Sequence, residues 1–225
     1  MGSLGETLLE ELNCETACTI FGIEIAESVA VTWGMMIILA VVSFLVTRRL
    51  KVENPGRWQL LLEYAVTWLQ QTTENIVGEK GKRYAPYLTA VLIYLGIANL
   101  LGIVGVKPPT KDLNVPAALA LMSIALIEWA GIRERGVGGW LKSFTQPVAL
   151  TTPFNILEVV VRPLSLCMRL FGNILGAFVI MKLAEFVLPV GLPVVFGAYF
   201  DLFDGLIQAY VFVFLTGLFI REAVE

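Results

Sequence analysis

The sequence predicts an all-α integral membrane protein with about five membrane helices and one amphipathic helix at the membrane interface. Of its 225 residues, 57% are hydrophobic and 16% are charged, whereas a soluble domain carries about 25% charged residues. The mean hydropathy is +0.77. Apolar runs long enough to cross a bilayer recur along the chain, separated by loops rich in charge, proline and glycine.

The N-terminal half supplies the first elements. Residues 1–27 carry several glutamates and no early lysine or arginine, so we expect an N-terminal extracytoplasmic segment rather than a signal peptide. A first span follows at about 28–46, and residues 28–225 form a single membrane domain. The more polar stretch at about 58–77 predicts an amphipathic helix lying along the interface. The second and third spans are expected at about 86–106 and 115–132.

The last two apolar segments, at about 155–188 and 193–220, are too long for a straight crossing. A helix along the membrane normal needs about 20 residues. A longer apolar stretch is accommodated by tilt. We therefore expect two adjacent, strongly tilted helices that present a long diagonal face to a neighbour.

Lysine and arginine set the expected orientation, because cytoplasmic loops are enriched in both. The predicted topology places the N-terminus outside and the C-terminus in the cytoplasm. The basic residues gather in the loops after the first and third spans: Arg48, Arg49, Lys51, Arg57, Lys80, Lys82 and Arg83, then Arg133, Arg135 and Lys142.

The composition also restricts the chemistry. The chain has no histidine, so a proton path would have to use carboxylates, amides, hydroxyls and water. Its three cysteines have no histidine beside them to complete a metal site, and we expect neither a metal nor a cofactor. No basic cluster with interleaved aromatic residues suggests nucleic acid.

Arg169 lies in the middle of the apolar run from Val159 to Leu188. Arginine does not lose its proton at physiological pH. A central arginine costs roughly 2.5–3.5 kcal/mol even on the lenient insertion scale, so it indicates function by default. No carboxylate stands one helical turn from Arg169, which suggests a counter-ion supplied by another chain. The alternative is a structural pair with Asp201 or Glu158.

Polar residues form a stripe on each of the last two predicted helices. Spacings of three and four residues put the members of each stripe on one face. Glu158 could instead form a simple ion pair with Arg162, and Asp201 and Asp204 could lie close to the lipid headgroups. Ser165 and Gly176 could serve only close helix packing. The first stripe is Glu158, Arg162, Ser165, Arg169, Asn173 and Gly176; the second is Asp201, Asp204 and Gln208.

Several runs resemble subunit a of the F-type ATP synthase in its bacterial form. The most specific is Arg169-Leu-Phe-Gly-Asn173, preceded by Pro153-Phe-Asn-Ile-Leu-Glu158 and Arg162-Pro-Leu-Ser-Leu166. The run Gln208-Ala-Tyr-Val-Phe212 with Leu215-Thr216 matches as well. Weaker echoes are Asn99-Leu100 with Gly102 and the run Pro109 to Asn114.

The resemblance implies an ion-translocating stator subunit in the cell membrane, without catalytic chemistry or cofactor of its own. Its partners would be the c-ring, the peripheral-stalk b subunits and lipid. Arg169 would be the essential charge facing the ring, with Gln208 as its neighbour. Two aqueous half-channels would couple H⁺ or Na⁺ flow to rotation, and the half-channel candidates are Asn173, Gln208, Asp201, Asp204, Glu158 and Ser165. Phe178 falls where some relatives carry a polar or ionisable residue.

Two other functions stay open at this point. A secondary transporter or channel could use Arg169 as an anion site between tilted or broken helices. However, no pair of corresponding halves is visible in the sequence. A non-transporting assembly subunit could use the polar stripes only to hold neighbours together.

Overall fold

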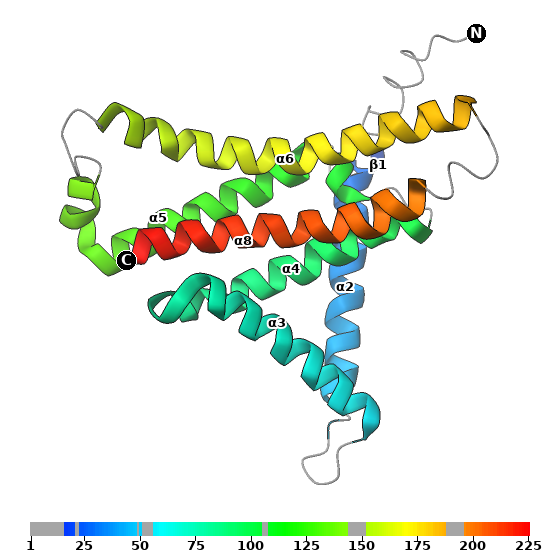
Figure 1. Ribbon diagram of the computed structural model, residues 1–225. Coiled ribbons are helices and arrows are strands. Elements are labelled where there is room, and N and C mark those ends of the chain that lie inside the picture. Colours follow the sequence, from blue (N-terminus) through cyan, green and yellow to red (C-terminus); the bar gives the residue numbers. More distant parts are fainter. Residues whose placement is uncertain are drawn as a thin grey trace.

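The computed structural model consists mainly of long helices (Figure 1). It describes residues 16–20, 23–48, 50, 56–104, 108–143, 152–187 and 196–225, except the side chains of 16–25, 185–187, 198 and 201. The elements in order are β1 (Thr16–Ile20), β2 (Ile23–Ala26), α2 (Glu27–Thr47), α3 (Arg57–Gly81), η1 (Lys82–Tyr84), α4 (Ala85–Leu100), η2 (Leu101–Val104), η3 (Pro109–Lys111), α5 (Asn114–Ser143), α6 (Thr152–Val187), the π-helical η5 (Ala198–Asp204) and α8 (Gly205–Val224).

The predicted multi-span membrane fold is confirmed. Among the described residues, five helical stretches are long and apolar enough to cross a membrane. The second of these joins α3 and α4 through a 3₁₀ turn. The five stretches are Glu27–Thr47, Arg57–Ile103, Asn114–Ser143, Thr152–Ala184 and Leu202–Val224.

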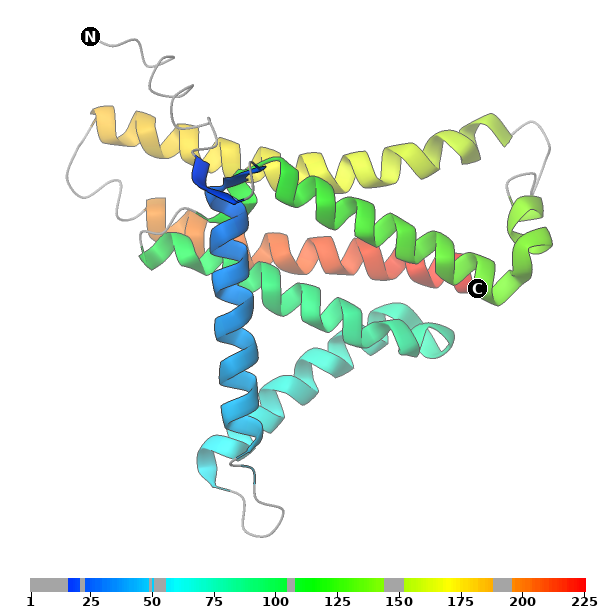
Figure 2. The ribbon, with the colours of Figure 1, turned by 180° about the vertical axis from the view of Figure 1, so that it is seen from behind.

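Helix α8 is the centre of the packing. It lies against α3, α4 and α5, whereas α6 packs mainly on α5 and touches α8 at few points. In both ribbon views α4, α5, α6 and α8 run roughly alongside one another (Figures 1 and 2). Glycine permits the closest approach, since a Cβ at Gly217 would stand 2.6 Å from Cγ2 of Ile76 on α3. Phe212, Val213 and Ile220 of α8 are fully enclosed.

Helix α2 stands across this group of helices at one end (Figures 1 and 2). Its contacts are with η3 and the two strands. Ser28 at its start donates a short hydrogen bond to Asp112 beside η3. Because α2 crosses the direction of the others, the helices cannot all follow one membrane normal. This arrangement agrees with the predicted strong tilt of the last two helices.

Four local differences separate the structure from the sequence prediction. The predicted N-terminal segment contains an antiparallel hairpin of β1 and β2, in which Thr16 pairs with Ala26 and Ile20 with Ile23. Its β-branched residues favour strands. The third span does not end at Ile132, because α5 continues to Ser143. Only Gly136 interrupts it, with a φ of 71° that glycine adopts without strain.

The third and fourth differences concern α3 and the last helix. Helix α3 covers the predicted residues 58–77 and extends to Gly81, with a break at Gly78 where φ is 77°. Its C-terminal half packs against α4 and α8 and buries Thr73 and Val77. The last helix begins with the π-helical η5 instead of regular α-helix. Residues 144–151 and 188–195, which include the junction between the last two predicted spans, lie outside the described residues.

Candidate functional site

Arg169 stands about midway along α6 and is partly buried. Its neighbours Leu166 and Leu170 are buried against the rest of the molecule. In the part of the chain that the structure describes, its guanidinium makes no hydrogen bond, ion pair or ring contact. Of the two structural alternatives for Arg169, the pair with Glu158 is therefore not formed, and the pair with Asp201 involves a side chain outside the described residues.

Arg162, two turns earlier on α6, has charged partners by contrast. One guanidinium nitrogen lies 3.2 Å from Glu158 and 3.0 Å from each carboxylate oxygen of Glu222 on α8. The guanidinium also lies 4.7 Å from the ring centroid of Phe219. Glu158 thus occupies the simple ion pair that its spacing allowed. Glu222, which the sequence did not single out, is the second partner.

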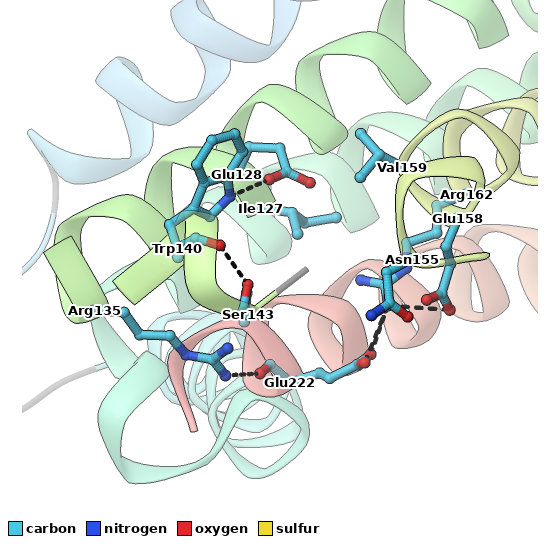
Figure 3. Close-up of a pocket in the computed structure, with 12 residues that line it drawn as sticks. Ile127, Glu128, Arg135, Trp140, Ser143, Asn155, Glu158, Val159, Arg162 and Glu222 are labelled. Carbon is cyan, nitrogen blue, oxygen red and sulfur yellow. Dashed lines mark hydrogen bonds and ion pairs between the residues drawn. The ribbon is translucent and has the colours of Figure 1, made fainter. Parts of the chain in front are cut away.

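A cavity of about 350 Å³ opens beside this ion pair; we call it the Glu222 cavity (Figure 3). It is built from α5, α6 and the C-terminal end of α8. Trp140 closes one side by donating a 2.7 Å hydrogen bond to Glu128. Its polar and charged lining residues are Glu128, Arg135, Trp140, Ser143, Asn155, Glu158, Arg162 and Glu222.

Pro163 contributes a further polar group to the same place. A proline inside a helix has no N–H for the carbonyl four residues earlier, and that carbonyl belongs to Val159. Val159 lines the Glu222 cavity. The carbonyl is thus left without its helical donor beside a space large enough for water.

A second cavity, of about 140 Å³, lies on the other side of Arg169 along α6; we call it the Asp204 cavity. Asp204 and Gly205 line it where η5 passes into α8. A π-helical turn has one extra residue and is frequent at functional sites. The remaining lining residues are Asn99, Pro108, Lys111, Asn173, Ile174, Ala177, Phe178, Phe200 and Gln208.

Asn173 and Gln208 join α6 to α8 at this cavity. The Asn173 side-chain nitrogen donates to the Gln208 oxygen over 2.6 Å. Gln208 is only 4% exposed, and its own side-chain nitrogen is buried without a partner among the described groups. Buried donors are normally satisfied, so this nitrogen is an exception within the described part of the chain.

Two polar side chains of the Asp204 cavity, those of Lys111 and Asn99, were not predicted as site residues. The Lys111 ammonium lies 3.9 Å from the ring centroid of Phe178. By the resemblance, Phe178 stands where some relatives carry a polar or ionisable residue, so Lys111 brings a positive charge to that position. Asn99 donates to the Gly205 carbonyl over 2.8 Å and accepts from Thr110 over 3.1 Å. In the sequence, only the two weaker matches to the family, at Asn99 and around Thr110, pointed to these residues.

The structure brings some predicted candidates together and leaves others apart. Asn173, Gln208 and Asp204 share one cavity, while Glu158 lines the other. Ser165 is exposed on α6 and lines neither. The side chain of Asp201 lies outside the described residues. Within the described part, no cluster of three or more Cys, Asp or Glu could hold a metal ion.

Comparison with known proteins gives one consistent answer. The family model of the ATP synthase A chain matches residues 29–221. ATP synthase subunit a 2 of a Bradyrhizobium strain is 39% identical over 90% of this chain and 90% of its own. ATP synthase subunit a of Moorella thermoacetica is 36% identical over 90% of this chain and 93% of its own. That of Albidiferax ferrireducens is 34% identical over 89% and 87%.

The family match thus reaches into all five stretches that could cross a membrane, and it includes Arg169, the whole Asp204 cavity and all but Glu222 and Ala223 of the Glu222 cavity. The resemblance seen in a few short runs therefore extends over nearly the whole chain. This multi-pass membrane protein belongs to the ATP synthase subunit a family.

Proposed function

We propose that this chain is the ion-translocating stator subunit of an ATP synthase, and that Arg169 is its fixed charge against a rotating ring of c subunits. The observation that carries the proposal is the guanidinium midway along α6, which has no partner among the described side chains. A charge at that depth is costly unless it is paired. A partner that is present only while the ring passes would supply that pairing.

The chemistry follows from the cost of burying charge. A ring carboxylate can face lipid when neutral but not when ionised. A fixed guanidinium at the same depth lets it stay ionised while it passes the stator. Two unit charges at 4 Å attract by about 4 kcal/mol at an effective dielectric of 20. That energy favours the ionised ring carboxylate but does not hold it permanently at Arg169.

The two cavities would be the inner parts of two half-channels. They lie on opposite sides of Arg169 along α6, one beside Arg162 and the other beside Asn173. A cation would leave the ring through one and reach it through the other after nearly a full turn. The positive field of Arg169 would oppose direct leakage between them.

The distribution of basic residues supports an orientation for this path. Arg135 of the Glu222 cavity belongs to the basic stretch that we expect in the cytoplasm, as does the C-terminus. The Glu222 cavity would then be the cytoplasmic half-channel and the Asp204 cavity the outer one. We expect peripheral-stalk b subunits and lipid to contact the apolar faces of α2 and α3, where Trp33 and Trp58 are exposed.

The alternative of an anion transporter is less well supported. A substrate site at Arg169 would need to enclose the guanidinium. Arg169 lines neither of the two cavities described here. A guanidinium on an open helix face is better suited to a moving protein partner than to a small substrate, which a cavity would enclose.

The test is ATP-driven cation uptake by the assembled complex in vesicles, measured with and without sodium. Arg169→Ala is expected to abolish uptake, because the ring carboxylate loses its partner. Arg221→Ala is the matched control, since Arg221 is exposed and pairs only with Glu225 near the end of the chain. Normal uptake by an assembled Arg169→Ala complex would refute the proposal.

A further inference from the structure

We propose that Lys111 weakens the hold of the outer half-channel on its cation, so that the cation moves on between the ring and the outside instead of staying at Asp204. The inference rests on the proposed function, in which the Asp204 cavity belongs to the outer half-channel. It starts from a basic side chain in the wall of a cavity that would conduct positive ions.

The charge balance of the Asp204 cavity depends on two residues. Among the described side chains that line it, only Lys111 and Asp204 are charged, and most of the neutral ones are apolar. Charges interact more strongly in such surroundings than in water. A lone carboxylate there would hold a cation tightly, and a nearby ammonium would oppose that hold with comparable strength.

Buried hydrogen bonds fix the turn that carries Lys111. Thr110, the residue before it in η3, is fully buried and donates to Asn99 of α4 over 3.1 Å. Asn99 in turn donates to the Gly205 carbonyl over 2.8 Å, at the point where η5 passes into α8. These two bonds join η3 to the π-helical turn that ends in Asp204. Both charged residues are therefore held at the same cavity.

The Phe178 ring of α6 receives the ammonium end of Lys111. The two are 3.9 Å apart, measured to the ring centroid, which is within the range of cation–π attraction. Lys182, one turn later on α6, approaches the same ring at 5.8 Å. However, Lys182 lines neither of the two cavities described here. Lys111 thus presents its charge to the proposed ion path, whereas Lys182 provides a natural comparison.

Conduction requires a site that attracts an ion strongly enough to admit it and weakly enough to release it. Asp204 supplies the attraction. At an effective dielectric of about 20, one unit charge changes the retention of a cation roughly tenfold even from about 12 Å away. A bound proton or sodium ion cancels the charge of Asp204 but not that of Lys111. The repulsion that remains favours release of the cation.

The test uses the assembled complex in vesicles whose interior corresponds to the outer side. The interior is preloaded with the coupling cation at graded concentrations, and the initial rate of ATP-driven uptake is measured. Lys111→Met removes the charge but keeps the length of the side chain, and Lys111→Arg keeps the charge. Lys182→Met is the matched control, because it removes an ammonium from the same ring without changing the lining of the cavity.

In Lys111→Met, the interior concentration that halves the uptake rate should fall about threefold to tenfold, because the cation is released more slowly. Lys111→Arg should recover the original concentration, and Lys182→Met should leave it unchanged. Adding Asp204→Asn to Lys111→Met should abolish most of the fall, since the site of retention is gone. If Lys111→Met fails to assemble, Lys111→Gln gives the same measurement. A purely structural role would lower the rate equally at all interior concentrations.

The inference is overturned if Lys111→Met and Lys182→Met are halved at the same interior concentration, or if Lys111→Arg shows the same fall as Lys111→Met. A fall that persists in full without the Asp204 carboxylate overturns it as well. The outcome for Arg169→Ala distinguishes this failure from that of the proposed function. Uptake lost in Arg169→Ala, with no effect of Lys111→Met, removes only the role of Lys111. Normal uptake in Arg169→Ala removes the proposed function itself.

Discussion

Two arginines on one helix, seven residues apart, have opposite surroundings. Arg162 meets two carboxylates and an aromatic ring. Arg169 meets none of these among the described residues. The first is held by its own chain and ties α6 to α8, whereas we propose that the second is left for a group outside the chain. In that proposal one helix carries both a structural and a functional charge.

The difference arises from what lies opposite on α8. The C-terminal end of α8 brings Glu222 to Arg162. Farther along the pair, Asn173 meets the neutral amide of Gln208. An amide can orient a passing guanidinium or carboxylate but cannot neutralise it. The middle of α6 therefore keeps its charge available.

The strongest test of the difference between the two arginines is to replace each of them, in separate variants, by lysine. Arg169→Lys should lower ATP-driven uptake by roughly 10²–10³-fold, the usual loss on removing a preorganised electrostatic group. A compact ammonium lacks the planar five-donor geometry. Arg162→Lys should stay within about threefold of the unaltered complex, because an ammonium can still bridge two carboxylates. Equal effects of the two changes would contradict the distinction.

Supplying Arg169 with an internal partner is the next test. Asn173→Asp places a carboxylate one helical turn away, at the spacing that pairs Glu158 with Arg162. Uptake should fall roughly 10–100-fold, because each passing ring carboxylate must displace that partner and about 1.4 kcal/mol corresponds to tenfold. Asn173→Leu removes the same amide hydrogen bond without adding charge, and its loss should be smaller. The opposite ranking would mean that the amide bond, not the free charge, matters at this position.

For the free energy of unfolding, the order of the two arginines should be reversed, with the larger effect at Arg162. Arg162→Met removes the partner of two carboxylates and should lower the free energy of unfolding by about 1–3 kcal/mol. Arg169→Met removes a charge that has no partner in the described chain, so the isolated chain should be unchanged or slightly more stable. Thermal unfolding of the full chain in detergent measures both. A larger loss in Arg169→Met would reveal an internal partner for Arg169.

The smallest expected effect concerns access to the outer side. Asp204→Asn removes a carboxylate from the Asp204 cavity and should slow cation access about threefold to tenfold, as expected for weaker electrostatic attraction. The difference should be greatest at low cation concentration on that side. Asp201→Asn is a parallel variant. A rate independent of both aspartates would leave Lys111 and the amides as the only polar groups of consequence there.

Much of the fold was predictable because apolar length and charge position are local properties. The five spans were expected from hydropathy, and the structure confirms five helices of sufficient length. The continuation of α5 to Ser143 was missed because a glycine-rich run with charges is typical of a loop. The hairpin of β1 and β2 was missed because its strands are short and carry little periodic signal.

The residues of the candidate site also fall into those that could be predicted from the sequence and those that could not. Arg169, Asn173 and Gln208 could be chosen from the sequence, because an arginine in an apolar run is costly and the flanking motifs are specific. Glu222 could not, because a glutamate near a chain end is ordinary. Lys111 could not, since nothing local indicates that it lies over Phe178.

The order of residues along the chain thus determined which helices can enter a membrane and that one of them carries a charge in its middle, because burial costs are set residue by residue. Only the tertiary structure decided which charges are neutralised. Neutralisation requires a carboxylate within about 4 Å. The end of α8 provides one for Arg162, whereas no described side chain provides one for Arg169.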